Sequence, residues 1–292
     1  MYELKSLSER CRYVECPSRI GVIEIGNGEV CFIDSGNDRS TAKKALKLIE
    51  ERKLKLKLIF NTHSHADHIG GNKFLSERTC CEIYAPGVEA AMTRYTYLEP
   101  ALLYGGYPMP ALRGKFMIAE PSQAMTLEHE KLPPGIKSIS LPGHTPEMTG
   151  YIVDGSIAYI GDAIAPASTL EKYGIFYLYD VSDYLKSLDT LMSLGCSVYL
   201  PSHSAPLYDI EEIVNYNRQK ISEIAEKITE ICDTGLSFDE ILAEAFNYYG
   251  ITITPEQYAL IGSTLRSYLS YLMDQGRVST VIENNMLKWK KS

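Results

Sequence analysis

The sequence predicts an α/β protein, in which a β-sheet is covered by helices, followed by a smaller and mainly helical region. Two observations predict this class. Short runs rich in β-branched residues alternate with amphipathic helical stretches through the first two-thirds of the chain. After about residue 208 the apolar residues instead repeat at helical spacing. We therefore expect two domains, residues 1–210 and residues 211–292.

Eight strands and two helices are predicted in the first region. The strands cover residues 21–25, 29–36, 56–62, 82–86, 137–143, 150–155, 157–162 and 196–203. The first helix opens at an N-cap near Asp38 or Ser40 and turns an apolar face inward. The second helix follows residue 180, with Ser182 as the expected N-cap and Gly195 as the stop.

The second region reads as helix, helix, helix and hairpin, which is the order of a winged helix. Its first helix covers residues 211–232. A capping box from Ser237 to Glu240 opens the next helix, and Thr254 with Pro255 opens the third. Residues 277–283 and 286–291 then form a hairpin around an Asn-Asn turn.

The composition restricts the classes of function. Hydrophobic residues make up 45% and charged residues 23% of the 292, which is ordinary for a globular protein. A formal net charge of −8 argues against a general affinity for nucleic acid. The seven cysteines form no CxxC pair, and no apolar run marks a signal peptide or a membrane span. We therefore expect a cytoplasmic protein with free thiols that does not associate with a membrane.

One short segment concentrates side chains that can bind a metal. The sequence NTHSHADHIGG places His63, His65, Asp67 and His68 within six residues, directly after a predicted strand. Crowded polar nitrogen and oxygen atoms cost free energy unless a cation satisfies them. Because the chain has only six histidines, this local concentration predicts a metal site.

Three further strand ends carry side chains of the same kind. His144 follows a Pro-Gly turn, Asp162 follows Gly161, and His203 follows Ser202. Loops at strand ends are where enzymes commonly place functional groups. His129 is the one remaining histidine, and its charged surroundings predict an ordinary exposed residue.

The set HxHxDH, PGHT, GD and SH resembles the motifs of the metallo-β-lactamase superfamily over roughly residues 15–207. The resemblance implies an αββα sandwich with a metal pair at one sheet edge. It implies that the first metal is bound by His63, His65 and His144. The second would be bound by Asp67, His68 and His203, with Asp162 bridging the two metals. The C-terminal order is similar to that of superfamily members with a winged-helix domain, some of which are endoribonucleases.

These ligand types suit two divalent ions, zinc first, with iron and manganese as alternatives. A metal-bridging hydroxide is the expected nucleophile, with Asp67 also orienting it. A small ester, thioester or lactone is the expected substrate. The alternatives are a ribonuclease or phosphodiesterase, a mono-iron enzyme like the persulfide dioxygenases, and a non-catalytic binding module. A secreted β-lactamase is disfavoured because no signal peptide is evident.

Other residues are candidates for supporting roles. The segment NTHSHADHIGG, residues 61–71, is called the ligand loop below. Asp34 either holds this loop by hydrogen bonds or is a simple turn residue. Glu147 stands after His-Thr-Pro, where the family often has glycine. The segment between the strands at 82–86 and 137–143 is a flexible aromatic lid, or else a packed surface excursion with or without a contact to a second copy of the chain. Its candidate residues are Arg94, Arg113, Tyr95, Tyr97, Tyr104 and Tyr107, and a second wall would carry Tyr173, Phe176, Tyr177 and Tyr179.

Overall fold

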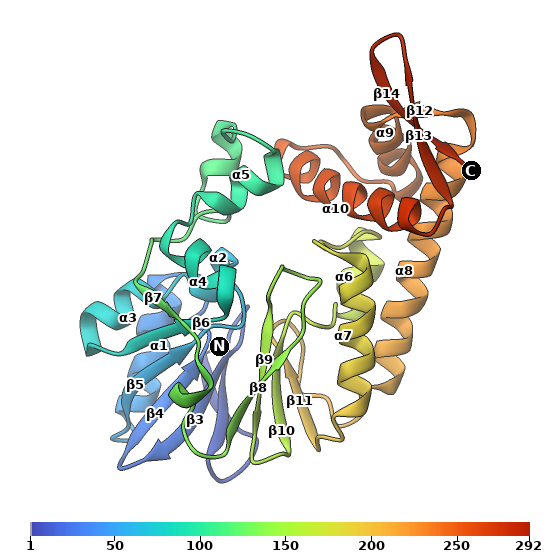
Figure 1. Ribbon diagram of the computed structural model, residues 1–292. Coiled ribbons are helices and arrows are strands. Elements are labelled where there is room, and N and C mark those ends of the chain that lie inside the picture. Colours follow the sequence, from blue (N-terminus) through green and yellow to red (C-terminus); the bar gives the residue numbers. More distant parts are fainter. Residues whose placement is uncertain (1) are drawn as a thin grey trace.

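The computed structural model describes residues 2–292, apart from the side chain of Tyr173. Two β-sheets face each other between layers of helices, and a mainly helical region follows at one end (Figure 1). The predicted α/β class and the αββα sandwich with a helical C-terminal region are therefore confirmed. Among the described residues, no helix is both long and apolar enough to span a membrane.

The first sheet contains seven strands in the order β1-β2-β3-β4-β5-β6-β7. Neighbours from β1 to β4 are antiparallel, and those from β4 to β7 are parallel. The helices α1 (Arg39–Glu50) and α3 (Asn72–Thr79) cover its outer face, burying Leu46 and Leu75 against it. The strands are β1 (Glu3–Ser6), β2 (Cys11–Glu15), β3 (Ile20–Gly26), β4 (Glu29–Ile33), β5 (Lys55–Phe60), β6 (Glu82–Ala85) and β7 (Ala124–Thr126).

Three strands of this sheet, β1, β2 and β7, are absent from the sequence prediction. All three are short; β1 and β7 are the two edge strands, and β2 lies next to β1. Edge strands need no continuous apolar run, so their sequences lack the pattern that marks a buried strand. The predicted strand at 29–36 also ends earlier, at Ile33, because the following residues turn toward the ligand loop.

The second sheet has the order β11-β10-β9-β8 and packs face to face with the first. Large rings such as Phe60, Tyr151 and Tyr159 fill the space between the sheets. The helices α7 (Val181–Ser193) and α8 (Glu211–Ile231) cover the outer face. The strands are β8 (Ile136–Ser140), β9 (Thr149–Val153), β10 (Ile157–Gly161) and β11 (Val198–Pro201).

The predicted N-cap of α7 is wrong. Asp180, not Ser182, caps this helix, and its carboxylate accepts a hydrogen bond from the Asp183 backbone N–H at 2.9 Å. Ser182 lies inside the first turn. The helix starts earlier because a carboxylate both accepts the free N–H and interacts favourably with the helix dipole.

The insert between β6 and β8 is a set of short helices rather than an open loop. It contains α4 (Gly87–Arg94), α5 (Leu98–Tyr104), the 3₁₀ turns η1 (Pro110–Arg113) and η2 (His129–Lys131), and β7. Leu103 and Leu112 of the insert pack against Ala259 of α10 (Pro255–Asp274). In Figure 1, α5 and α10 meet above the sandwich.

The C-terminal region continues the core of the sandwich. One apolar cluster runs from Ile160 in β10 through Leu188 in α7 and Ile224 in α8 to Leu265 in α10. The predicted boundary at residue 211 coincides with the start of α8, but it does not separate two independent cores, and the division into two domains stays a prediction. The remaining elements are η3 (Cys232–Thr234), β12 (Leu236–Ser237), α9 (Phe238–Tyr249), β13 (Val278–Glu283) and β14 (Met286–Lys291).

The predicted starts of the second and third helices of this region are present. Ser237 and Glu240 form the capping box of α9, and Thr254 caps α10 by accepting from the Gln257 N–H at 3.2 Å. β12 pairs with β14, which pairs with β13, giving a small three-stranded sheet. The assignment of this region as a winged helix stays a prediction.

Candidate metal centre

The seven predicted ligands meet at one end of the sandwich because the strands that carry them end there. β5 leads through Thr62 to His63 and to the short helix α2 (Ala66–Ile69), whose N-cap is His65. β8, β10 and β11 lead to His144, Asp162 and His203. Parallel strands end at the same sheet edge, so β4 with β5, and β10 with β11, deliver their loops to one place.

Two glycines of the motifs allow the loops to approach their neighbours closely. A Cβ on Gly71 would overlap the backbone carbonyl of Ser35. Gly143, in the turn before His144, has a φ of +118°, and a Cβ there would overlap the backbone of Tyr184. Side chains at these positions would push the ligand loops away from the sheet edge.

The seven side chains gather into three overlapping sets. Within each set, the donor atoms all lie within 4.8 Å of one another. His63 belongs to two sets, and Asp162 lies close to residues of both outer sets, with its Oδ2 3.5 Å from His144 Nε2 and 3.2 Å from His203 Nε2. The sets are His63, His65 and His144; His63, His68 and Asp162; and Asp67, His68 and His203.

Each of the five histidines uses one ring nitrogen for a contact outside the cluster. Such contacts fix the tautomer and the ring orientation of metal ligands. The partners are Thr62 Oγ1 for His63 (2.9 Å), Asp34 Oδ2 for His68 (2.9 Å), Pro17 O for His203 (3.0 Å), Tyr177 O for His144 (3.2 Å) and Glu99 Oε1 for His65 (3.2 Å).

Asp34 lies below the ligand loop and makes three of its contacts. It accepts from the Thr62 N–H at 2.7 Å and from the Thr62 hydroxyl at 2.8 Å, and it faces His68 Nδ1. Its φ of +62° turns the chain out of β4 toward this loop. The Thr62 hydroxyl donates its hydrogen to Asp34, so its oxygen must accept a hydrogen bond from His63 Nδ1–H. The other ring nitrogen of His63, Nε2, therefore carries the free lone pair.

The inward atoms are arranged as a cation would require. His63 Nε2, His68 Nε2 and Asp162 Oδ1 are buried without a hydrogen-bond partner among the described residues, which is rare for polar atoms. His144 Nδ1 must donate to the Tyr177 carbonyl, so its Nε2 carries a lone pair, and this atom lies 3.1 Å from His65 Nδ1. Nitrogen and carboxylate donors converging in this way fit divalent metal ions such as zinc.

Electrostatics divides the centre into two halves. Burial, reinforced by neighbouring imidazoles, holds the pKa of His63 well below its usual value and lowers the pKa of His65 to about 3. Burial opposes the charged form of His203, but Asp162 and Asp67 raise its pKa to about 10. The imidazoles of His63 and His65 are therefore neutral. On the other side of the centre, protonated imidazole offsets the negative charge of Asp67 and Asp162. A divalent cation would supply the same positive charge.

Ser18 holds the carboxylate of Asp67, with its hydroxyl donating to Oδ2 at 2.6 Å. Burial raises the pKa of this carboxyl, but His68 and the hydrogen bond with His203 lower it overall. The side chains of Asp67 and His203 are 41% and 34% exposed. The centre is therefore open to solvent on the side of the Asp67, His68 and His203 set.

The remaining predicted candidates lie away from the donor atoms. Arg94 donates to the Ala124 carbonyl of β7, and Arg113 donates to the Tyr107 hydroxyl at 2.9 Å. Tyr95, Tyr104 and Tyr107 are exposed, as is His129 on η2. None of these side chains has a described contact with the seven donors.

Glu147 joins the support of the ligand loop indirectly, through Glu89. The Glu147 backbone N–H donates to Glu89 Oε1 at 3.2 Å, and the Glu147 carboxylate accepts from the Val88 N–H. Glu89, fully buried on α4, accepts from both the N–H and the hydroxyl of Ser64 in the ligand loop, at 3.0 and 2.6 Å.

Sequence reasoning missed Glu89, Glu99 and Ser18. The two glutamates stand in mixed stretches of the insert, GVEAA and YLEPA, where a carboxylate normally faces solvent. Nothing in their local spacing distinguishes them from surface residues. The one available sign that these glutamates are buried is weak: each stands among apolar residues of a helical stretch.

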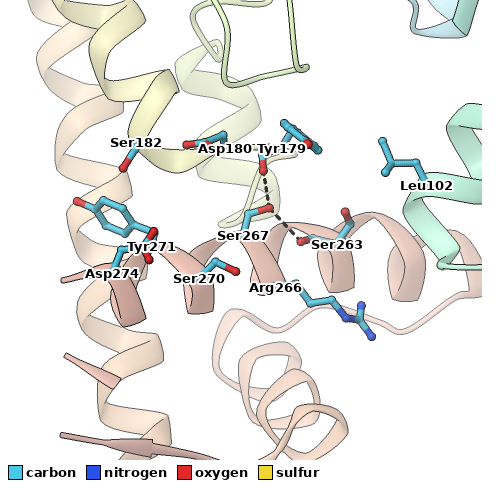
Figure 2. Close-up of a pocket in the computed structure, with 10 residues that line it drawn as sticks. All are labelled: Leu102, Tyr179, Asp180, Ser182, Ser263, Arg266, Ser267, Ser270, Tyr271 and Asp274. Atoms are coloured by element: carbon cyan, nitrogen blue, oxygen red, sulfur yellow. Dashed lines mark hydrogen bonds between the residues drawn. The ribbon is translucent and has the colours of Figure 1, made fainter. Parts of the chain in front are cut away.

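An aromatic wall stands beside the His63, His65 and His144 set. The Tyr177 ring lies edge-on to His65 and His144, with centroid separations of 5.3 and 5.5 Å. Two residues after Tyr177, the chain reaches a cavity of about 350 Å³ that lies between the start of α7 and α10 (Figure 2). Tyr179 and Tyr271 line it, and the Ser267 hydroxyl donates to the Tyr179 carbonyl at 2.7 Å.

Comparison with known proteins agrees with this architecture. A "Beta-lactamase domain protein" from Burkholderia ambifaria superposes with a TM-score of 0.77 at 15% identity, covering 99% of this chain and 94% of that one. This likeness includes the C-terminal region, and at this identity it concerns the fold alone.

Two curated relatives match parts of the sequence. An atrochrysone carboxyl ACP thioesterase from Aspergillus fumigatus is 24% identical over 192 residues, which are 65% of this chain and 52% of the relative. A hydroxyacylglutathione hydrolase from Thiobacillus denitrificans is 27% identical over 146 residues, which are 50% of this chain and 46% of the relative. The chain thus spans about half the length of these relatives.

The family profile covers the part of the chain that carries the motifs. Residues 13–203, from β2 to the last predicted ligand, match the profile of the metallo-beta-lactamase superfamily. This is more than half of the chain, and it agrees with the fold and with the convergence of the donor atoms. The protein is therefore a member of the metallo-beta-lactamase superfamily.

Proposed function

We propose that this protein is a hydrolase that cleaves a small acyl thioester, with esters and lactones as related substrates, using two zinc ions. The observation that supports it most strongly is that two separate sets of three donors lie on either side of Asp162, whose carboxylate is close to a histidine of each. One tetrahedral site cannot use seven donors. His63, His65 and His144 would hold one ion, Asp67, His68 and His203 the other, and Asp162 would contact both. Iron or manganese ions are the alternative to zinc at this site.

The ions would supply two effects when bound, polarising a carbonyl and lowering the pKa of water to about 7, so that hydroxide is available at neutral pH. The protein supplies the orientation. Ser18 fixes one carboxylate oxygen of Asp67 at 2.6 Å, and we infer that Asp67 orients the attacking oxygen. Asp34 and Thr62 keep the His63 and His68 rings turned toward the centre.

The substrate class rests on the wall and on the relatives. Tyr177 offers an apolar face beside two proposed ligands, and the insert and α10 restrict the space above it. This favours a small molecule over a duplex. Relatives named as an ACP thioesterase and as hydroxyacylglutathione hydrolases support a thioester. The seven cysteines are free thiols, as is usual in the cytoplasm, where we expect the enzyme to act.

Metal analysis with a substrate screen tests the proposal. Protein never exposed to chelator should carry close to two metal ions per chain by elemental analysis. Release of free thiol from short acyl thioesters should exceed cleavage of p-nitrophenyl esters, lactones and bis(p-nitrophenyl) phosphate. Chelation should abolish turnover, and zinc should restore it. Absence of metal would contradict the proposal, and faster cleavage of the phosphodiester would favour the nuclease alternative.

A further inference from the structure

We propose that Glu99 is a positioning residue that orients the His65 ring for metal binding from outside the sandwich. This inference rests on the metal site proposed above. Glu99 Oε1 lies 3.2 Å from His65 Nε2, and the opposite nitrogen, Nδ1, faces His144 Nε2 at 3.1 Å. An oxygen of the Glu99 carboxyl group can accept a hydrogen bond from His65 Nε2–H, which leaves the Nδ1 lone pair for the metal.

Glu99 differs from the other outer partners in its origin. The partners of the other four histidines come from residue 17, from the ends of β4 and β5, and from residue 177 before α7. Glu99 lies in the first turn of α5, within the helical insert. The insert therefore contributes directly to the centre, in addition to lying above it.

The packing of α5 holds Glu99 in place. Its side chain is only 13% exposed, and Leu103, one turn later, is buried against Leu112 and against Ala259 of α10. Because α10 supports α5, the C-terminal region indirectly determines where the carboxylate lies.

His65 has no other described acceptor for its Nε2 proton. The Tyr177 ring meets His65 edge-on and limits its tilt, but this contact involves no acceptor oxygen. The ring nitrogens of a histidine exchange places when the ring rotates by a half-turn. Without Glu99, the His65 ring would therefore also populate the flipped orientation, and the metal would have to select the orientation that turns Nδ1 toward the centre.

Zinc titration of the full chain tests the inference. Metal-free wild type, Glu99→Ala and Glu99→Gln are titrated with Zn²⁺ against a chromophoric chelator that resolves the two equivalents. In Glu99→Ala, one equivalent should bind roughly 10- to 100-fold more weakly, the usual effect of losing such a partner, while the other stays close to wild type. Glu99→Gln should recover most of the affinity, because its amide oxygen still accepts from Nε2–H.

Glu120→Ala is the matched control. It also removes one carboxylate from the insert, but Glu120 is 63% exposed and lies near Lys73 rather than a histidine. Its affinity for both equivalents should match wild type. Histidine ¹⁵N shifts of zinc-loaded wild type give a second readout that needs no variant, and they should show His65 bound through Nδ1 with Nε2 protonated.

The outcomes separate the two proposals. Wild type that binds no zinc would overturn the metal site and this inference together. Wild type that binds two zinc ions, with Glu99→Ala unchanged, would overturn only the role of Glu99. Equal losses in the Ala and Gln variants would also overturn it, because charge rather than orientation would then be responsible. Binding of His65 through Nε2 in wild type would do the same.

Discussion

At the residue scale, Asp67 combines exposure with a fixed orientation. Its neighbours His68 and His203 are proposed ligands, yet its side chain is 41% exposed and is held by Ser18. A carboxylate placed in this way can meet both a metal and an incoming water. The apolar core does not include it, so removing it should affect chemistry more than folding.

We therefore predict that Asp67→Ala lowers turnover of any substrate by roughly 10²-fold or more while leaving the far-UV circular dichroism spectrum unchanged. His129→Ala, a change at an exposed histidine apart from the centre, is the control and should retain activity. Wild-type turnover in a folded Asp67→Ala protein would mean that another group orients the nucleophile.

The cysteines give a second prediction at this scale. Burial raises the pKa of Cys16 and of Cys232 to about 11, which keeps both as thiols near neutral pH. Since the thiolate is the reactive form, iodoacetamide at pH 8 should label the exposed Cys80 first. Peptide mass spectrometry of a time course measures the order. Early labelling of Cys16 or Cys232 would show that the segment around it opens in solution.

At the scale of elements, the contact between α5 and α10 connects the insert to the C-terminal region. Leu103, Leu112 and Ala259 are all nearly inaccessible there, although the neighbouring surface of the insert exposes many aromatic rings. A small residue at position 259 lets the helices approach closely. A charge at that position would be buried without a partner, at a substantial cost in free energy.

Ala259→Glu should therefore release α5 from α10 without unfolding the sandwich. We expect chymotrypsin to cut the Tyr-rich insert several-fold faster than in wild type, with cleavage sites at Tyr95, Tyr97, Tyr104 or Tyr107. Ser270→Glu adds the same charge at an exposed position of α10 and should leave the cleavage rate unchanged. Equal cleavage rates in Ala259→Glu and wild type would show that the helix contact does not restrain the insert.

At the scale of the whole molecule, charge argues against nucleic acid as the main partner. Residues 211–292 contain 12 acidic and 8 basic residues, a net charge of −4. Phosphate binding needs clustered lysine and arginine. The exception is the end of β14, where Lys288, Lys290 and Lys291 surround Trp289. We expect the C-terminal region to serve substrate covering or assembly, as its contact with the insert suggests.

Gel-shift titrations with duplex and single-stranded oligonucleotides at physiological salt should accordingly show no tight binding. Full-length Lys288→Ala/Lys290→Ala protein serves as the comparison for any weak signal. Tight, salt-sensitive binding that this double variant loses would contradict the prediction and favour the ribonuclease alternative.

Much of the fold and the donor inventory could be predicted because both depend on local sequence. β10 is a continuous apolar run, and β5 alternates lysine with leucine before its apolar end. The ligands follow both strands within three residues. His63, His65, Asp67 and His68 are adjacent in sequence, so no tertiary knowledge is needed to group them. Capping residues such as Ser237 and Thr254 act within four residues, and both were predictable.

What surrounds the donors was decided only by the tertiary structure. Glu99 is 34 residues from His65, and the partners of His144 and His203 are backbone carbonyls, which no side-chain pattern can indicate. The short edge strands and the N-cap Asp180 escaped prediction because packing and competing caps, rather than hydrophobic periodicity, select them. Local sequence determined which atoms could bind a metal, whereas the long-range packing of the sheets, the insert and α10 decided how those atoms are oriented.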